Sequence, residues 1–289
     1  MKKQKLLKQK IERGLQGWGV SRVLHTAPHH DDIMLGYYSL IMRSPQVDHH
    51  MMYLVSGSNG VADEYLYRSL PKEHELIELY ERQGDFRGSS MATLMKMMIR
   101  ESEEEQLWNR SGIKCGMSHM RSTFYNDPYF NSKQTFNQDA SSCLSVIEKF
   151  SPELILVLHD SHVHGPNTHQ VSFRIVMEAV RAYEKDVPVW GYRNVWDRYS
   201  FDEAWVIVPV SQAEYDQQHK MFVECFGSQK KALYPSQHGT EPFTVYAQNI
   251  QKEQYQEAVA LLGEDYFKNH ADKRMRSAVG LILFEKVER

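Results

Sequence analysis

The first two thirds of the chain alternate between short apolar runs and segments with helical periodicity. Three apolar runs end in polar or turn residues: Arg22–Pro28, His49–Ser56 and Leu154–His159. Runs of this length are typical of strands that are buried on both faces of a parallel sheet. Helical patterns lie between them, near Asp32–Met42, Lys72–Phe86, Ser90–Ser111 and Phe136–Phe150. This alternation predicts a doubly wound α/β fold with a mostly parallel sheet.

The pattern changes after Asp186. Two strand-like runs, VPVWGYR and AWVIVPV, come first, and a helical pattern follows at Ser211–Phe226. The polar segment Leu233–Phe243 is typical of a loop. A second helical pattern, Ile250–Leu262, precedes the last apolar run, Val279–Phe284. We see no internal repeat and no obvious linker. We therefore predict one domain over residues 1–289, with a helix in residues 1–20 and a C-terminal extension, residues 187–289, packed on the same domain. A small C-terminal subdomain is the alternative.

Composition and charge exclude several classes of partner. The 289 residues are 42 % hydrophobic with a net charge of −3, which gives no field to attract nucleic acid. The basic start of the chain lacks the apolar core of a signal peptide, and no run reaches the roughly 20 apolar residues of a membrane span. Three scattered cysteines, Cys115, Cys143 and Cys225, fit a reducing compartment. We expect a cytoplasmic protein without a membrane span; its oligomeric state is open, a homo-oligomer included.

The strongest chemical signal is the HHDD run, which follows the first predicted strand and opens a helix. His29 and Asp32 are three residues apart, close enough at a strand-to-helix turn to bind one cation with an imidazole and a carboxylate. Asp31 lies between them and could act on water bound to that metal. Clustered carboxylates at a buried strand end repel each other unless a cation compensates their charge, which favours a metal.

A second polar cluster, residues 159–169, follows the third apolar run and contains four histidines. A helix after Asn167 would hold His169 firmly. His-rich loops are often only solvated polar caps, but both clusters follow predicted parallel strands, whose carboxyl ends meet at one edge of the sheet. Two histidines and a carboxylate, with an open position for substrate, make a catalytic metal site, and we predict one here.

These residues resemble a known family. The segment Ala27–Asp32, APHHDD, is similar to the AHPDD signature of the LmbE/PIG-L de-N-acetylases, zinc enzymes with a Rossmann-like fold. The branch of the family fused to glucosamine-6-phosphate deaminase is also similar at Val55–Asp63, Ile99–Glu103, Thr168–Gln170 and Trp190–Trp196. The match runs from about residue 22 to about residue 267. It contains no counterpart of the deaminase domain, so a deaminase label would not transfer.

The resemblance implies a fold, a cofactor and catalytic roles. The fold would be Rossmann-like, with three αβα layers. His29, Asp32 and His169 would bind one Zn²⁺ per chain, and Asp31 would be the general base that deprotonates the zinc-bound water. A histidine shortly before the last ligand stabilises the oxyanion in family members, and His164 is the candidate for that role.

The candidates for substrate binding are Arg100, Ser58, Asn59 and Arg193. Arg100 would bind a substrate hydroxyl or phosphate, or pair with Glu103 or a site carboxylate. Ser58 and Asn59 belong to a turn-prone run whose backbone N–H groups could hold a phosphate, although a plain surface turn explains the run equally well. Arg193 belongs to an aromatic and basic patch suited to a sugar ring, which interior packing explains nearly as well.

Two departures from the family pattern affect the site. The proline of AHPDD is His30 here, which adds a third imidazole near the metal without changing the ligand spacing. His164 and His169 are five residues apart instead of three, so Gly165–Asn167 resembles an expanded turn. In that case His162 or Asp160 could take the place of His164.

The sequence therefore predicts a metal-dependent hydrolase that removes an N-acyl group, expected to be acetyl, from a small-molecule amino sugar or sugar conjugate. One alternative is a degenerate relative that binds a sugar without turnover, favoured by the expanded turn and the altered HHDD motif. Another is a hydrolase of a different bond, such as a phosphoester, although phosphoesterases need more carboxylates than we can assign. Fe²⁺, Co²⁺ or Ni²⁺ could replace Zn²⁺, since sites of this composition accept them.

Overall fold

A mixed seven-stranded sheet forms the centre of the computed structural model, which describes residues 2–125, 133–161, 167–230 and 241–289. The strand order is β3-β2-β1-β4-β5-β7-β6. The first five strands in this order are parallel, and β7 and β6 are antiparallel at one edge. The strands are β1 (Arg22–Ala27), β2 (Asp48–Tyr53), β3 (Cys115–His119), β4 (Leu154–Leu158), β5 (Val189–Tyr192), β6 (Ala204–Ser211) and β7 (Ala278–Val287).

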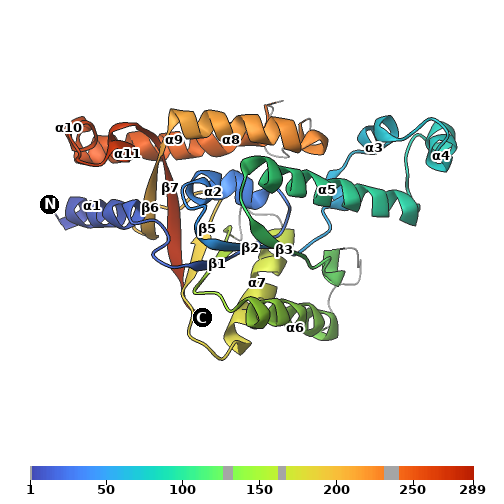
Figure 1. The fold of residues 1–289 in the computed structure, drawn as a ribbon, viewed down its shortest axis with the longest axis horizontal. Helices are drawn as coiled ribbons and strands as arrows, with labels where there is room; N and C mark the ends of the chain where they lie inside the picture. Colours follow the sequence, from blue (N-terminus) through green and yellow to red (C-terminus); the bar gives the residue numbers. More distant parts are fainter. Residues whose placement is uncertain (1, 126–132, 162–166, 231–240) are drawn as a thin grey trace.

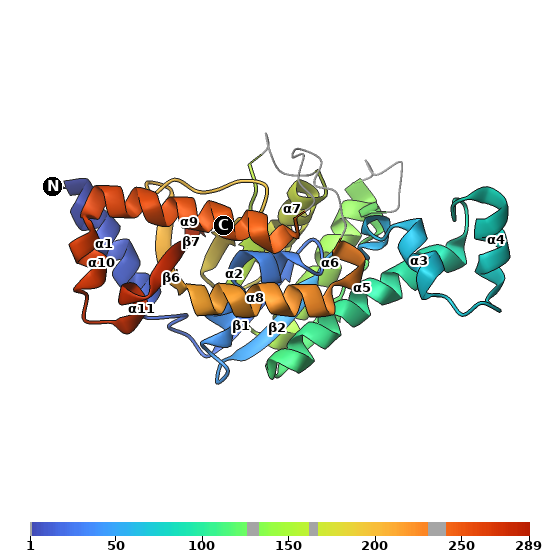
Figure 2. The ribbon, with the colours of Figure 1, turned by 90° about the horizontal axis from the view of Figure 1, so that it is seen from above.

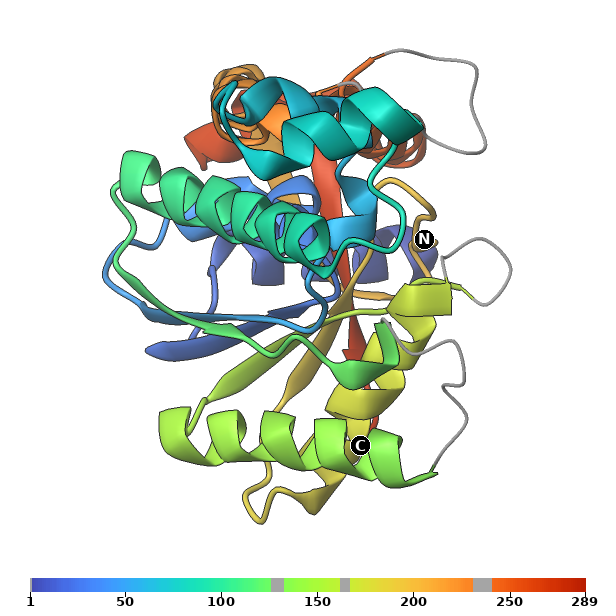
Figure 3. The ribbon, with the colours of Figure 1, turned by 90° about the vertical axis from the view of Figure 1, so that its right-hand side faces the viewer.

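Helices cover both faces of this sheet (Figures 1 and 3). One face carries α2 (Asp32–Met42), α5 (Ser90–Ser111), α8 (Gln212–Cys225) and α9 (Phe243–Leu262), and the other carries α6 (Lys133–Phe150) and α7 (Asn167–Ala182). The predicted three-layer α/β fold with a mostly parallel sheet is thus confirmed.

The side chains of β4 show why an unbroken apolar run forms a central strand. Leu154, Leu156 and Leu158 pack into the core cluster under α2 and α8, whereas Ile155 and Val157 pack into the cluster under α6 and α7. Successive side chains of a strand point to opposite faces, so a strand covered on both sides must be apolar at every position.

Smaller elements lie at the two ends of the sheet (Figures 1 and 2). At one end α1 (Lys2–Leu15) packs on β6, near α10 (Glu264–Lys268) and α11 (Lys273–Arg276). At the other end lie α3 (Asp63–Ser69) and α4 (Glu75–Gln83). Among the described residues, no helix is both long and apolar enough to cross a bilayer.

The C-terminal residues 187–289 contribute three strands, β5 to β7, to the same sheet as the N-terminal strands. This arrangement agrees with an extension packed on one body. That residues 1–289 form a single domain stays a prediction.

Three differences from the predicted elements have local causes. β3 is absent from the prediction because CGMSH is not an apolar run; as an edge strand it keeps most of its residues partly exposed. α4 is shorter than Lys72–Phe86, because the side chain of His74 caps its start and Gly84, with φ of 77°, ends it. α9 begins at Phe243, earlier than predicted, directly after Pro242, whose fixed φ suits the start of a helix.

The sheet topology creates a crevice at the carboxyl end of β1. From β1 the chain continues to β2 and β3 on one side and then returns to β4 on the other side. The loops that leave β1 and β4 therefore diverge to opposite faces of the sheet, which opens a binding crevice between them. The two polar clusters of the sequence follow these two strands.

The contact between α1 and β6 has no room for a side chain at Gly14. A Cβ atom on Gly14 would lie 1.9 Å from the carbonyl oxygen of Ile207. We predict that Gly14→Ala lowers the free energy of unfolding by about 2 kcal/mol or more, because backbone must move to admit the methyl group. Urea denaturation would measure this change. Gln9→Ala, at an exposed position of the same helix, is the control, and equal stability of the two variants would contradict the prediction.

Two buried histidines form a hydrogen-bonded chain under the sheet. Nε2 of His49 lies 2.9 Å from the carbonyl oxygen of Ser44, which can only accept, so this nitrogen carries the proton. Nδ1 of His49 then accepts from Nε2 of His25 at 2.9 Å, and Nδ1 of His25 accepts from the hydroxyl of Tyr37 at 3.1 Å. Both imidazoles are fully buried, and with both rings neutral every nitrogen of the chain has a partner.

This chain predicts acid sensitivity. Burial, with the neighbouring His49 and His50, holds the pKa of His25 well below its ordinary value, and burial lowers the pKa of His49. Below about pH 6.5 the unfolded chain therefore binds protons that the folded chain does not, so stability falls as the pH falls. We expect urea denaturation to give a lower free energy of unfolding at pH 5.5 than at pH 7.5, with a smaller difference for His49→Gln. His219→Gln, at a half-buried histidine, is the control; an unchanged pH difference in His49→Gln would contradict the prediction.

Candidate metal centre

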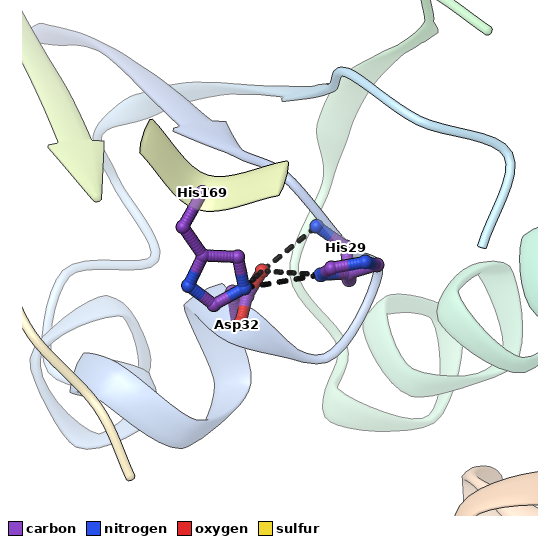
Figure 4. Close-up of side chains that lie close together, drawn as sticks. All are labelled: His29, Asp32 and His169. Carbon is purple, nitrogen blue, oxygen red and sulfur yellow. Dashed lines mark hydrogen bonds and ion pairs between the residues drawn. The ribbon is translucent and has the colours of Figure 1, made fainter. Parts of the chain in front are cut away.

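Three predicted ligands converge in the crevice beside β1 (Figure 4). His29 follows β1, Asp32 begins α2, and His169 lies in the first turn of α7, which follows β4. Nδ1 of His29 lies 3.2 Å from Nε2 of His169 and 3.5 Å from Oδ2 of Asp32. Nε2 of His169 lies 3.8 Å from the same carboxylate oxygen.

The HHDD turn places the first two ligands. The backbone N–H of His29 donates to Oδ2 of Asp32 at 2.7 Å, so the carboxylate folds back over the strand end. The N–H of Asp32 in turn points to the carbonyl oxygen of His29 at 3.4 Å. The spacing of three residues therefore closes one tight turn from strand to helix.

Outer partners fix two of the ligands. Nδ1 of His169 lies 2.6 Å from Oδ2 of Asp160, which accepts its proton and leaves the lone pair on Nε2, the atom that faces the other ligands. The side-chain amide of Asn194 donates to Oδ1 of Asp32 at 2.7 Å and leaves Oδ2 toward the cluster. Both partners are buried, which restricts the rotation of the ligands.

The donor set fits a zinc-type cation. Ligand atoms about 2.0–2.2 Å from a tetrahedral ion are separated by about 3.3–3.5 Å, close to the separations observed here. Burial alone would raise the pKa of Asp32, but His169 and His29 outweigh burial and hold this pKa below its usual value. Burial alone would lower the pKa of His169, but Asp32, Asp160 and Asp31 raise it. The carboxylates around His29 and His169 therefore stabilise a positive charge at this position.

Asp31 stands beside the three ligands and pairs with Arg100. Its Oδ1 lies 3.0 Å from Nη2 of Arg100, and Nη1 of Arg100 donates to Oε2 of Glu103, also at 3.0 Å. The Arg100 side chain is 2 % exposed, which shows that the guanidinium is enclosed between two carboxylates. The pairing alternative for Arg100, with Glu103 and a site carboxylate, is therefore the arrangement observed; contact with a substrate stays a prediction.

A cavity of about 140 Å³ opens at the three ligands. Its other walls combine polar groups with apolar side chains: Asp31, Arg100, Gln229, Gly57, Gly60, Leu35, Val195, Trp196 and Phe243. The Trp196 ring stands edge-on to the His169 ring at 6.3 Å. The cavity offers a reacting group direct access to both the ligand atoms and Asp31.

His30 does not join the ligand cluster. It is fully buried and its ring stacks on Tyr53 at 5.0 Å. Neither ring nitrogen has a hydrogen-bond partner within the described part of the chain. Burial, followed by the charge of Arg100, holds its pKa well below the ordinary value, so His30 is a neutral, buried ring beneath the site.

The remaining predicted site residues lie at varied distances from the cavity. The hydroxyl of Ser58 is buried against Ser56 at 3.1 Å, and Asn59 is exposed; their neighbours Gly57 and Gly60 line the cavity. Arg193 donates to the carbonyl oxygens of His159 and Arg198 and is absent from the cavity lining. His164 lies outside the described residues. The substrate contacts of these residues stay predictions.

Sequence reasoning did not assign roles to several residues of the site. Asn194 lies inside the matched Trp190–Trp196 stretch, so the match could have marked it as a partner of Asp32. Asp160 entered only as a substitute for His164, whereas it binds His169. Gln229 and Phe243 reach the cavity from the C-terminal extension, and no spacing pattern in the sequence connects them to the HHDD run.

No family model matches the chain. A curated glucosamine-6-phosphate deaminase-like protein of Bacteroides thetaiotaomicron is 23 % identical over 224 residues. The match covers 67 % of this chain and 34 % of that protein, so it spans about a third of the relative's length.

Solved structures give a broader match. A deacetylase of teicoplanin biosynthesis superposes with a TM-score of 0.56 at 13 % identity, over 92 % of this chain and 99 % of that chain. The N,N′-diacetylchitobiose deacetylase of Pyrococcus horikoshii has a TM-score of 0.55 at 14 % identity, over 98 % and 89 % of the two chains. The chain has the fold of the LmbE/PIG-L-type deacetylases.

The deacetylase fold does not by itself select a reaction. The 4-carboxy-2-hydroxymuconate hydratase of Pseudomonas putida matches equally well, with a TM-score of 0.56 at 13 % identity over 93 % of this chain and 97 % of that chain. The predicted resemblance is confirmed for the fold. The chemistry must be argued from the residues of the crevice.

We predict that the three ligands bind one metal ion together. Zinc-loaded wild-type protein should retain about one ion per chain after dialysis, and His29→Ala, Asp32→Ala and His169→Ala should retain none. Asp160→Asn should weaken zinc affinity by about 10- to 100-fold, because it removes the charge that orients His169. Elemental analysis and zinc titration would measure both effects.

Asp139→Asn is the matched control for the metal prediction. Its carboxylate is also buried, but it binds the backbone and hydroxyl of Thr123, and neither residue lines the cavity. Full zinc content in any of the three alanine variants would remove that residue from the ligand set.

Proposed function

We propose that this chain is a metal-dependent hydrolase that removes an N-acyl group, acetyl in the first instance, from an amino sugar or sugar conjugate. The observation that carries this proposal is a carboxylate, Asp31, placed beside a His-Asp-His donor set in one cavity. Two proteins with the same fold are a teicoplanin-pathway deacetylase and a diacetylchitobiose deacetylase, which supports the choice of an acylated amine as substrate.

His29, Asp32 and His169 would hold one Zn²⁺, with Fe²⁺, Co²⁺ or Ni²⁺ as alternatives for the same donor set. When bound, such an ion supplies a Lewis acid and lowers the pKa of water toward about 7. One of the proteins with this fold, a teicoplanin deacetylase, has been solved in a zinc-inhibited form, so the native ion is best identified by experiment.

Asp31 would be the general base. Arg100 holds its Oδ1, which leaves Oδ2 as the oxygen that accepts a proton from the attacking water and passes it to the leaving amine. The enclosed guanidinium orients the carboxylate. His164, proposed from the sequence as the donor to the oxyanion, lies in a segment that is not described.

The apolar wall of the cavity suits the acyl group. Leu35 and Val195 are buried, and Trp196 and Phe243 are partly buried against the same core cluster. A short acyl chain packed there would lose its contact with water, and its carbonyl would face the ligand atoms.

A binding protein without turnover is the alternative carried from the sequence. The intact base argues against it, since a protein that only binds a sugar has no need of a carboxylate placed beside a metal site. The two functions differ in whether acetate is released.

We predict that metal-loaded wild-type protein releases acetate from at least one member of a panel of N-acetyl amino sugars. Asp31→Asn should lower kcat by about 10²- to 10⁴-fold while it keeps the metal, because it removes the proton acceptor and spares the ligands. An enzymatic acetate assay and elemental analysis on the same samples would measure the two quantities.

Asp139→Asn is again the control and should keep wild-type turnover. Loss of metal in Asp31→Asn would make Asp31 a ligand instead of the base. Tight sugar binding by metal-loaded wild type without any acetate release would favour the non-catalytic alternative.

A further inference from the structure

The segment Phe226–Gln229, which follows α8 and contains the short helix η3 (Gly227–Gln229), lies against α5 behind the site. It belongs to the C-terminal extension, more than 120 residues from the α5 residues that it contacts. A Cβ atom on Gly227 would lie 2.5 Å from the hydroxyl oxygen of Tyr65 in α3, so the backbone of the segment also packs closely against α3. The segment therefore presents fixed donors to α5.

Ser228 donates two hydrogen bonds to one carboxylate. Its backbone N–H donates to Oε1 of Glu103 at 2.5 Å, and its hydroxyl donates to Oε2 of the same residue at 2.8 Å. Ser228 is 6 % exposed and Glu103 is 4 % exposed, so water does not compete for these bonds. Both oxygens of Glu103 are thereby oriented.

The orientation of Glu103 is passed on to Asp31 through Arg100. Oε2 of Glu103, the oxygen that accepts from the Ser228 hydroxyl, also accepts from Nη1 of Arg100 at 3.0 Å. The other terminal nitrogen of Arg100 contacts Oδ1 of Asp31 at 3.0 Å. A planar guanidinium fixed at one edge by Glu103 is also fixed at the edge that faces Asp31.

Two further contacts of the segment support the same arrangement. The Phe226 ring lies under the guanidinium of Arg100 at 5.6 Å, and the side-chain amide of Gln229 donates to the carbonyl oxygen of Gly60 at 2.9 Å. Burial raises the pKa of Glu103, and Arg100 and the donors of Ser228 oppose that rise. Removal of the Ser228 hydroxyl would therefore make the ionised form of Glu103, the partner of Arg100, less stable.

We propose that Ser228 is a positioning residue for the catalytic base: its hydroxyl fixes Glu103, Glu103 fixes Arg100, and Arg100 aims the carboxylate of Asp31 into the cavity. The role as a base rests on the proposed function. The chain of contacts Ser228–Glu103–Arg100–Asp31 does not.

The test compares Ser228→Ala with Ser228→Thr and Ser44→Ala. Ser228→Thr keeps the hydroxyl. Ser44→Ala removes a serine hydroxyl of equal burial, 6 % exposed, at the opposite end of the sheet. The first measurement needs no substrate: the Nε–H resonance of Arg100 in protein labelled with ¹⁵N-arginine, assigned by Arg100→Lys. The second is kcat and KM for acetate release from the best N-acetyl sugar, with metal content measured in parallel.

We expect a sharp, slowly exchanging Arg100 resonance in wild type, Ser228→Thr and Ser44→Ala, and a broadened or rapidly exchanging one in Ser228→Ala. We expect kcat to fall about 10-fold in Ser228→Ala, with KM and metal content unchanged, because the base is misaligned while the ligands and the cavity persist. Restoration of both readouts by Ser228→Thr would separate positioning from a general loss of packing.

An unchanged Arg100 resonance in Ser228→Ala, or a kcat equal to that of wild type, would overturn the proposal. Wild type without turnover would count against the proposed function only, since the resonance still tests the contacts. If Ser228→Ala does not fold, Glu103→Gln replaces it: the variant keeps an acceptor for Ser228 but loses the charge that holds Arg100, and it should give the same two changes.

Discussion

The burial of negative charge at the carboxyl ends of two parallel strands is the constraint on which this site depends. Asp31, Asp32 and Asp160 are each 5 % exposed or less, at strand ends that share one crevice. Ionised carboxylates in such a place are costly unless each has a cation or a donor. Arg100 compensates Asp31, Asn194 and the imidazoles compensate Asp32, and His169 compensates Asp160. A metal ion held by the candidate ligands would complete the balance.

The C-terminal extension supplies part of this compensation. Asn194 follows β5 and Ser228 follows α8. Asn194 orients the candidate ligand Asp32, and Ser228 orients the proposed base through two further side chains. The antiparallel strands β6 and β7 hold the extension on the sheet. The C-terminal extension thus contributes to the geometry of the site as directly as the parallel strands do.

The same fold supports a hydratase and several deacetylases, so the fold alone does not select a reaction, and the surroundings of the candidate metal site must be considered. In this chain the surroundings are an enclosed Arg–Asp pair on one side and an apolar wall on the other. His30 adds a buried neutral ring beneath the site and leaves the ligand spacing unchanged. These features favour an acyl group near a base over a charged phosphoester.

The sequence by itself determined several of the helices and strands and three candidate ligands. Periodicity fixed α2 and α5 at their observed bounds, and the HHDD run with His169 named the three side chains that the structure brings together. These signals are local, because a helix or a strand-to-helix turn depends on residues a few positions apart. Only the tertiary structure decided that Arg100 is enclosed between two carboxylates, that Asp160 orients His169, and that Ser228 supports Glu103 from 125 positions away. Contacts between residues so far apart in the chain produce no recognisable pattern in the sequence, because they arise only when packed layers bring distant segments together.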